Sequence, residues 1–350
     1  MKLEMDETLF GALYPYIQDD DITDIRWNGH ALWVENLKKG RYRTDVKLDD
    51  EFLGIFTQRI ANMQNINFNS SMPSLQASTE TLRIHCIHPF RTGDHTYSLS
   101  IRKVPAVVRI NEQSIKETKY AQPATIELLA ALIRNRYKGI IIGDVGAGKT
   151  ELLKYLARYI PDNMSTLTAE DTLEMKLPAL YPGKDISSVL LDEKYPAEQA
   201  IRDALRLETR YLWLAEARGR EIARIMEGAS TGCTVWTTIH TNNVWDIPDR
   251  IVQMTGNLGD DKDYENDVFA FFDVGVKVEK IITDHGIRRY IDQICFFERD
   301  QKENRTVTIL KNGHFTGETI PESIIEKLQE NEEKRTLHLL QQAGLVPGKK

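Results

Sequence analysis

Apolar and polar residues follow different patterns in the two parts of this chain. In the N-terminal part, several short segments alternate apolar and polar positions, which is typical of half-buried strands. These segments are residues 23–27, 31–35, 82–88 and 97–103. Asn28 with Gly29, and Lys39 with Gly40, supply turn signals between early segments. We therefore predict antiparallel hairpins here.

Two helices are predicted in the same part of the chain. The first runs through Leu9, Leu13 and Ile17. The second follows Asp49 and Asp50, either of which can cap a helix. Its apolar residues recur at helical spacing: Phe52, Ile55, Phe56, Ile60 and Met63. Together with the hairpins, these helices predict a small α+β domain over residues 1–104.

The C-terminal part, residues 123–350, alternates apolar strands with helices. The predicted strands are residues 139–143, 164–169, 211–216 and 233–240. The predicted helices are residues 125–134, a segment beginning near Lys149, residues 197–207 and residues 220–230. Such alternation is typical of a mainly parallel sheet with helices on both faces. Residues 105–122, with one short helix around residues 111–118, form a predicted linker.

The end of the chain has a different pattern. Residues 271–278 and 287–298 alternate and flank Asp284, His285 and Gly286, and residues 306–310 form a further segment. We expect an antiparallel β appendage, followed by one amphipathic helix that Pro321 opens and that continues towards Leu340.

Composition and charge narrow the possible functions. With 350 residues the chain is long enough for two domains. A net charge of −7 and a pI near 5.7 argue against direct nucleic-acid binding. The three cysteines form no C-x-x-C pair, so neither a disulfide framework nor a thiolate zinc site is indicated. Strand alternation separates His85 from Cys86 and His88, which favours strand packing over a metal site. Without a signal peptide or a long apolar run, we expect a cytoplasmic protein with peripheral membrane contact.

The strongest chemical signal is a glycine-rich loop between a predicted strand and a predicted helix. It comprises Gly143, Asp144, Val145, Gly146, Ala147, Gly148, Lys149 and Thr150, followed by Glu151. The pattern G-x-x-x-x-G-K-[ST] cradles phosphates with backbone N–H groups and a helix N-terminus. Lys149 would reach the β- and γ-phosphates of ATP, and the Thr150 hydroxyl would join the Mg²⁺ shell.

Other polar residues stand where the predicted strands end. The acidic group is Glu170, Asp171 and Glu174, and the next two strands end at Glu216 and His240. In open α/β sheets ligands bind beyond the carboxyl ends of strands, so these residues are site candidates. Glu216 would stand beside the phosphate loop if their two strands are neighbours, and His240 could donate a hydrogen bond to the γ-phosphate. A solvated acid and a structural histidine are the alternatives.

The order of these motifs resembles the secretion-superfamily traffic ATPases of type II and type IV secretion and type IV pili. The matching boxes are residues 143–150 (Walker A), 168–174 (the Asp box), 214–218 (Walker B) and 231–240 (the His box). Residues 20–25, 98–102, 274–278 and 286–290 are similar to the branch that serves type IV secretion, conjugation and tight-adherence pili.

This resemblance implies a RecA-like P-loop NTPase domain, a separate N-terminal domain and a homo-hexameric ring that binds ATP and Mg²⁺. It assigns Glu170, Asp171 and Glu174 as Asp-box acids, Glu216 as the Walker B acid and metal contact, and His240 as the His-box residue. It also matches basic residues that approach the nucleotide: Arg83, Arg102, Arg206 and Arg218. Implied partners are inner-membrane secretion or pilus platform proteins, with a protein or nucleoprotein substrate moved indirectly.

Three departures from the family pattern stand in the sequence. Ala215 replaces the usual glycine before the Walker B acid. The His box begins at Cys233 without its common histidine, which leaves His240 as its only histidine. The four-cysteine zinc module of the type II branch is absent.

We therefore predict a cytoplasmic ATPase, bound peripherally at the inner face of the membrane, that powers type IV secretion, conjugative transfer or pilus assembly. A RecA-like nucleic-acid motor and a non-catalytic nucleotide-gated scaffold are the alternatives.

Overall fold

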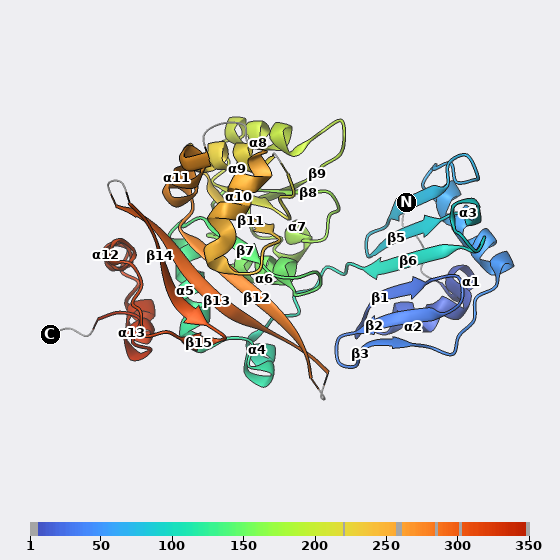
Figure 1. Cartoon of the computed structure of the whole chain (residues 1–350), viewed down its shortest axis with the longest axis horizontal. Helices are drawn as coiled ribbons and strands as arrows, with labels where there is room; N and C mark the ends of the chain where they lie inside the picture. The colour runs from blue at the N-terminus through green and yellow to red at the C-terminus, as the bar shows by residue number, and fades with distance from the viewer. Residues whose placement is uncertain (1–5, 220, 257–260, 284–285, 301–302, 348–350) are drawn as a thin grey trace. The chain divides into compact units, whose positions relative to one another are not determined.

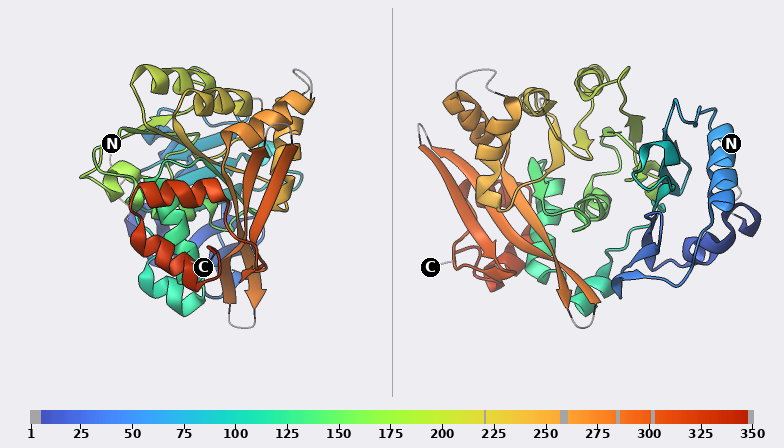
Figure 2. Two further views of the ribbon diagram at one scale, coloured as in Figure 1. Left: turned by 90° about the vertical axis from the view of Figure 1, so that its left-hand side faces the viewer. Right: turned by 45° about the vertical axis from the view of Figure 1, so that its right-hand side comes forward.

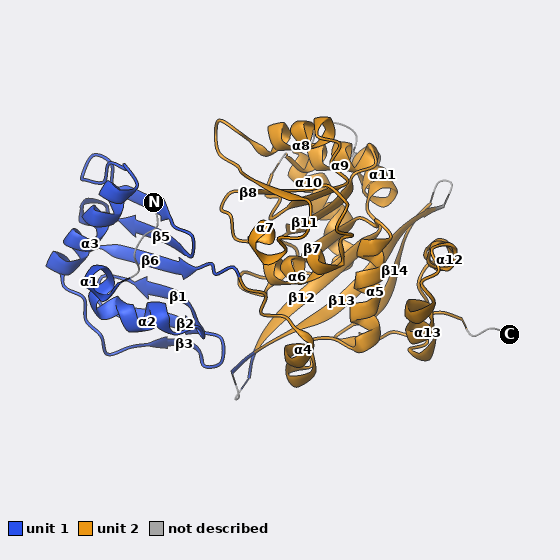
Figure 3. Cartoon of the chain, turned by 180° about the vertical axis from the view of Figure 1, so that it is seen from behind, with its two compact units in different colours: residues 1–106, 282–287 blue, residues 107–281, 288–350 orange. Residues whose placement is uncertain are grey.

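The computed structural model describes residues 6–219, 221–256, 261–283, 286–300 and 303–347. They form two compact units (Figure 3). Unit 1 contains Met1–Ala106 and Ile282–Ile287, and unit 2 contains Val107–Ile281 and Arg288–Lys350. None of the described helices is long and apolar enough to cross a membrane.

Unit 1 is an antiparallel sheet covered by helices. Its strand order is β3-β2-β1-β6-β5-β4. The strands are β1 (Ile22–Trp27), β2 (Leu32–Asn36), β3 (Gly40–Arg43), β4 (Ser74–Ser78), β5 (Leu82–Ile87) and β6 (Ser98–Lys103). The helices are α1 (Glu7–Phe10), the 3-10 turn η1 (Gly11–Leu13), α2 (Tyr14–Gln18) and α3 (Asp50–Met63), with a second 3-10 turn, η2 (Pro89–Arg91). The predicted α+β pattern of hairpins and helices is confirmed.

Side-chain alternation decides the core of unit 1. The Asp49 carboxylate caps α3 by accepting from the Phe52 N–H at 2.7 Å. Helix α3 buries Phe56 and Ile60 but leaves Ile55 half-exposed, so Ile55 was wrongly included in the core face. On β5 Cys86 is buried, whereas His85 lies on the exposed face, as the alternation predicts.

Unit 2 contains a nine-stranded sheet with the order β15-β14-β13-β12-β7-β11-β10-β8-β9. The strands are β7 (Gly139–Ile142), β8 (Thr166–Glu170), β9 (Ile186–Leu190), β10 (Tyr211–Leu214), β11 (Thr234–Ile239), β12 (Val274–Thr283), β13 (Gly286–Asp300), β14 (Glu303–Lys311) and β15 (His314–Phe315). From β12 to β9 every neighbouring pair is parallel. The predicted α/β class is therefore confirmed.

Helices cover both faces of this sheet (Figure 1). Helices α5 (Pro123–Arg134), α6 (Lys149–Leu156), α12 (Glu322–Glu330) and α13 (Lys334–Gln342) pack on one face. Helices α8 (Ala197–Arg206), α9 (Glu221–Ser230), α10 (Ile247–Thr255) and α11 (Asp261–Phe271) pack on the other. The short helices α4 (Glu112–Thr118) and α7 (Leu177–Leu180) and the turns η3 (Ala157–Tyr159) and η4 (Val244–Asp246) complete the unit. Two layers of helix therefore bury the central strands completely (Figure 2).

The C-terminal segments differ from their predicted arrangement in two ways. Strand β12 is parallel to β7 and belongs to the central sheet, so only β13 to β15 form an antiparallel extension. The single predicted helix is two helices, because the chain turns at Glu332, whose φ is +55°, and Glu333 binds Arg134 of α5. Asp284 and His285 of the predicted turn, and Arg220 at the predicted helix start, lie outside the described residues.

Candidate active site

The glycine-rich loop joins the end of β7 to the start of α6. Gly143, Gly146 and Gly148 have φ values of +148°, +72° and +103°, which residues with a Cβ atom rarely adopt. A Cβ on Gly143 would stand 2.3 Å from the Val278 carbonyl oxygen of β12. The first N–H groups of α6 have no acceptor within the helix, so they face the loop as donors for an anion.

Lys149 is held inside this loop. Its side chain is 9% exposed, and Nζ donates to the carbonyl oxygens of Gly143 at 2.8 Å and Asp144 at 3.2 Å. Burial lowers the pKa of Lys149, although the negative charges of Glu216 and Asp144 oppose that shift. The ammonium group is thus poised where phosphate oxygens could replace the carbonyl contacts.

A row of contacts connects Lys149 to the acids at the neighbouring strand ends. Lys149 Nζ lies 3.5 Å from Nδ1 of His240, and His240 Nε2 lies 3.1 Å from Oε1 of Glu216. Oε2 of Glu216 accepts from Arg218 at 2.8 Å, and Arg218 also binds Asp171 at 3.1 Å. The strand order β7-β11-β10-β8 places these residues side by side at one edge of the sheet. Because β11 separates β7 from β10, Glu216 reaches the loop through His240.

Neighbouring charges favour the ionised forms of Glu216 and Arg218. Burial alone would raise the pKa of Glu216, but the hydrogen bond and charge of Arg218, with the charges of His240 and Lys149, bring it below its usual value. The hydrogen bond from Arg218 to Glu216 in turn raises the pKa of Arg218. Since an ionised Glu216 can only accept, the network assigns a ring proton of His240 to Nε2, the atom that faces Glu216.

Glu170 has a structural position within the Asp box. It is 1% exposed, and Oε2 accepts from the backbone N–H groups of Glu174 at 2.9 Å and Met175 at 2.8 Å. Its other carboxylate oxygen, Oε1, is buried without a hydrogen-bond partner. Burial raises its pKa to about 7, because those two N–H bonds only partly compensate for lost solvent. The structure thus brings Asp171, rather than Glu170, into contact with Arg218.

The remaining loop residues have different environments. Asp144 and Val145 are exposed, and Ala147 is buried. Thr150 lies in the first turn of α6 and is partly exposed. Glu151 forms an ion pair with Lys154 at 2.8 Å and accepts from the Arg109 N–H. Glu151 therefore fixes α6 to the segment before α4 rather than facing the loop.

The structure does not bring every predicted arginine to this edge. Arg206 ends α8, before β10 begins, so it lies towards the opposite edge of the sheet, where its guanidinium is 3.7 Å from Asp203. In unit 1, Arg83 and Arg102 are register partners on the exposed face of β5 and β6, and Arg102 binds Asp24 at 2.7 Å.

Two basic residues at the loop were not predicted as site residues. Arg289 of β13 donates from Nε to the Gly146 carbonyl oxygen at 3.1 Å. Lys280 of β12 has its Nζ 3.3 Å from where a Cβ of Gly146 would stand. The alternating pattern of the C-terminal strands gave no sign of this position, because it depends on β12 lying beside β7.

Comparison with known proteins agrees with this geometry. Residues 50–311 match the family of type II/IV secretion system proteins. VirB11 from the type IV secretion system of Brucella suis is 27% identical over 252 residues, which cover 63% of this chain and 69% of VirB11. An uncharacterized protein of Bacillus anthracis is 26% identical over 336 residues, covering 91% of this chain and 76% of that protein.

A solved structure extends the likeness to the fold. The pilus retraction motor PilT with bound ADP has a TM-score of 0.60 and 17% identity, and the match covers 98% of this chain and 90% of PilT. The predicted RecA-like fold is thereby confirmed. With a phosphate loop, a strand-end acid and a family match over most of its length, the chain is a nucleotide-binding ATP hydrolase that belongs to the type II/IV secretion system protein family.

Proposed function

We propose that this chain is the cytoplasmic motor of a type IV secretion, conjugation or pilus assembly machine, and that it works as a homo-hexamer. The observation that carries the proposal is the row from Lys149 through His240, Glu216 and Arg218 to Asp171. It joins the phosphate loop to a carboxylate beyond the carboxyl ends of the parallel strands, where ligands of open α/β sheets bind. The VirB11 match supports the type IV branch.

The residues of the row have distinct proposed roles. Lys149 exchanges its loop carbonyl contacts for phosphate oxygens and thereby offsets their negative charge. Glu216, kept ionised by its neighbours, is a weak base, so it orients the attacking water rather than removing a proton early in the reaction. His240 contacts both Lys149 and Glu216, so a displacement of Lys149 on phosphate binding would also move Glu216. Arg218 and Asp171 hold Glu216 from its other side.

Mg²⁺ fits the donors at this edge. Among the described residues no group of three or more His, Cys, Asp or Glu side chains could hold a metal ion. Mg²⁺ commonly binds one or two protein oxygens together with substrate phosphates and water. The Thr150 hydroxyl and the Glu216 carboxylate would be those protein ligands, and the ion would neutralise phosphate charge.

Arg83 and Arg102 remain proposed phosphate contacts, and Arg206 is proposed to contact the nucleotide of a neighbouring subunit rather than its own phosphate loop.

The boundaries 1–104, 105–122 and 123–350 remain our proposed domains. The nucleotide-binding assignment is supported by the ADP in the PilT structure. We further propose peripheral attachment to inner-membrane secretion or pilus platform proteins.

ATP hydrolysis by purified wild-type protein, measured as phosphate release, tests the site. Lys149→Ala and Glu216→Gln should each lower turnover at least about a hundredfold while thermal melting stays unchanged. Glu318→Gln, at an exposed acid outside the site, is the matched control, and it should retain turnover within a few-fold. Wild-type-like hydrolysis by Lys149→Ala or Glu216→Gln would exclude the role of that residue.

Mass measurement with and without ATP tests the ring. A shift to six copies on nucleotide binding is expected, and a monomer under all conditions would contradict the hexamer. Stimulation of hydrolysis by single-stranded DNA, with a steep salt dependence, would instead favour the nucleic-acid motor.

A further inference from the structure

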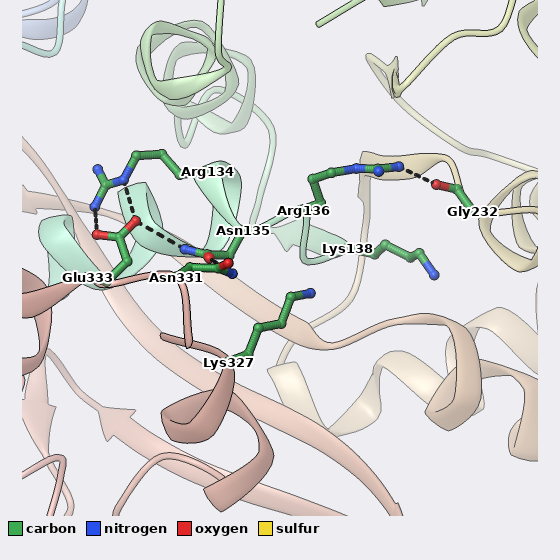
Figure 4. Close-up of a pocket in the computed structure, with 8 residues that line it drawn as sticks. All are labelled: Arg134, Asn135, Arg136, Lys138, Gly232, Lys327, Asn331 and Glu333. Atoms are coloured by element: carbon green, nitrogen blue, oxygen red, sulfur yellow. Dashed lines mark hydrogen bonds and ion pairs between the residues drawn. The ribbon is translucent and has the colours of Figure 1, made fainter. Parts of the chain in front are cut away.

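A polar pocket lies in unit 2, away from the phosphate loop. Its volume is about 610 Å³. It is lined by Arg134, Asn135, Arg136, Lys138, Gly232, Lys327, Asn331 and Glu333 (Figure 4). Lys138 directly precedes β7, whereas the phosphate loop follows β7. The pocket is therefore at the opposite edge of the sheet from the ATPase site.

Three cations at this pocket have no carboxylate bound to them among the residues that the structure describes. Arg136 donates to the Gly232 carbonyl oxygen at 2.6 Å and to the Thr234 hydroxyl at 3.2 Å, both uncharged acceptors. The Lys327 ammonium lies 4.2 Å from the centre of the Tyr137 ring. Lys138 extends its side chain beside the pocket (Figure 4), and among the described residues its ammonium forms no ion pair. The opening is thus surrounded by positive charge.

The acids around the pocket are already engaged. Glu333 accepts from Arg134 at 2.7 and 2.8 Å and from Asn135 at 3.1 Å. Asp273 is half-buried and accepts from the Lys138 backbone N–H at 2.6 Å. Burial, together with the charges of Arg136 and Lys138, lowers the pKa of Lys327, although Asp273 and Glu330 oppose this shift. The Lys327 ammonium is therefore close enough to Arg136 and Lys138 to feel their charges, while Asp273 and Glu330 offset part of them.

The backbone holds Arg136 in this place at a cost. Arg136 has a φ of +61° at the end of α5, a position where glycine would be unstrained. Left-handed geometry is unfavourable for a residue with a side chain. Asn135 beside it is buried and bonds to Ala131, Glu333 and Asn331. The Arg136 guanidinium is thus held at the pocket by hydrogen bonds that do not depend on a ligand.

We propose that this pocket binds the phosphate groups of a compact polyanion. Two ammonium groups and one guanidinium match the charge and hydrogen-bonding capacity of a diphosphate. The volume is that of a small-ligand site. A pocket of this volume suits a compact phosphate group better than an extended acidic peptide. The bound phosphate can come from a soluble molecule or from a lipid headgroup.

Inorganic pyrophosphate is the first probe, titrated calorimetrically into full-length Lys149→Ala protein so that the phosphate loop does not compete. The double variant Lys138→Gln with Lys327→Gln in that background should bind at least about tenfold more weakly, since two positive charges that attract the phosphates are lost. Lys116→Gln with Lys194→Gln, two exposed lysines elsewhere, is the matched control and should not change the affinity. Hydrogen exchange on the wild-type chain should show pyrophosphate-dependent protection around residues 134–138 and 327–331.

Further arms distinguish the sources. If the protein sediments with phosphatidylglycerol vesicles but not with vesicles of phosphatidylcholine alone, and the double variant does not sediment with either, the ligand is a lipid headgroup. Pyrophosphate binding without vesicle binding would identify a soluble ligand. An unchanged pyrophosphate affinity in the double variant, no exchange protection, or binding of hexaglutamate in place of pyrophosphate would overturn the proposal.

Discussion

Glu170 offers a quantitative test of how the Asp-box loop is held. Its carboxylate accepts two backbone N–H groups, those of Glu174 and Met175, of which Met175 is fully buried. Glu170→Ala leaves both donors without their acceptor, at about 1–3 kcal/mol for each buried group. We expect a loss of about 3 kcal/mol, which for a domain of this size lowers Tm by about 6–12 °C.

The pH dependence gives a second, independent arm. Because the folded-state pKa of Glu170 is raised to about 7, the folded chain keeps a proton that the unfolded chain releases near its ordinary value. This group therefore favours the folded state at low pH, and the advantage is lost as pH rises through 7. Between pH 5.5 and 8.5 the change amounts to about 2 kcal/mol.

Glu170→Gln separates the two effects, since it retains an acceptor for the N–H groups but cannot ionise. Calorimetric melting of wild type, Glu170→Gln and Glu170→Ala at pH 5.5, 7 and 8.5 is the assay. The stability of Glu170→Gln relative to wild type should increase by about 2 kcal/mol across that range. A constant difference between these two proteins, or an unchanged Tm for Glu170→Ala, would refute the reasoning.

Two further substitutions examine the walls of the phosphate loop. Gly143→Ala introduces a Cβ 2.3 Å from the Val278 carbonyl oxygen at a φ of +148°, so nucleotide binding measured by fluorescence titration should fall more than about tenfold. Wild-type affinity would show that the loop is free to move. Arg289→Gln removes a cation bonded to the Gly146 carbonyl, and it should weaken nucleotide binding about fivefold in the same titration. Arg288→Gln, which changes the exposed neighbouring arginine, should leave nucleotide binding unchanged. Equal effects of the two arginine variants would contradict a specific role.

Much of the site could be predicted because its chemistry follows from local patterns and one rule of sheets. Three glycines, a lysine and a threonine between an apolar strand and a helix define the loop without any distant contact. Glu216 comes two residues after β10 and His240 directly after β11, and parallel neighbours end at the same edge. Their 3.1 Å contact follows from β10 and β11 being neighbours. The alternation of strands and helices predicts a parallel sheet whose strands end on one side, but it left open which strands are neighbours.

Other features depend on contacts that no local pattern encodes. The break between α12 and α13 occurs where Glu333 binds Arg134, a residue about 200 positions earlier, so helical spacing alone predicted one long helix. Glu170 was predicted as a catalytic acid because it belongs to the Asp box. Its actual role depends on whether its carboxylate faces the nucleotide site or binds the backbone of residues 174 and 175. In the structure it binds the backbone. Arg206 shows the same limit, because a motif match does not say at which end of a strand a residue lies.

The position of β12 explains why the C-terminal strands bear on nucleotide binding. Because β12 is parallel to β7 and next to it, the Val278 carbonyl approaches Gly143 so closely that only glycine fits. The same strand carries Lys280 towards Gly146, and the following strand carries Arg289 to the Gly146 carbonyl. The outer wall of the phosphate loop is thus built by residues more than a hundred positions after it. A movement of β12 and β13 would change the loop and its cations together, which gives the C-terminal extension a direct mechanical connection to the bound phosphates.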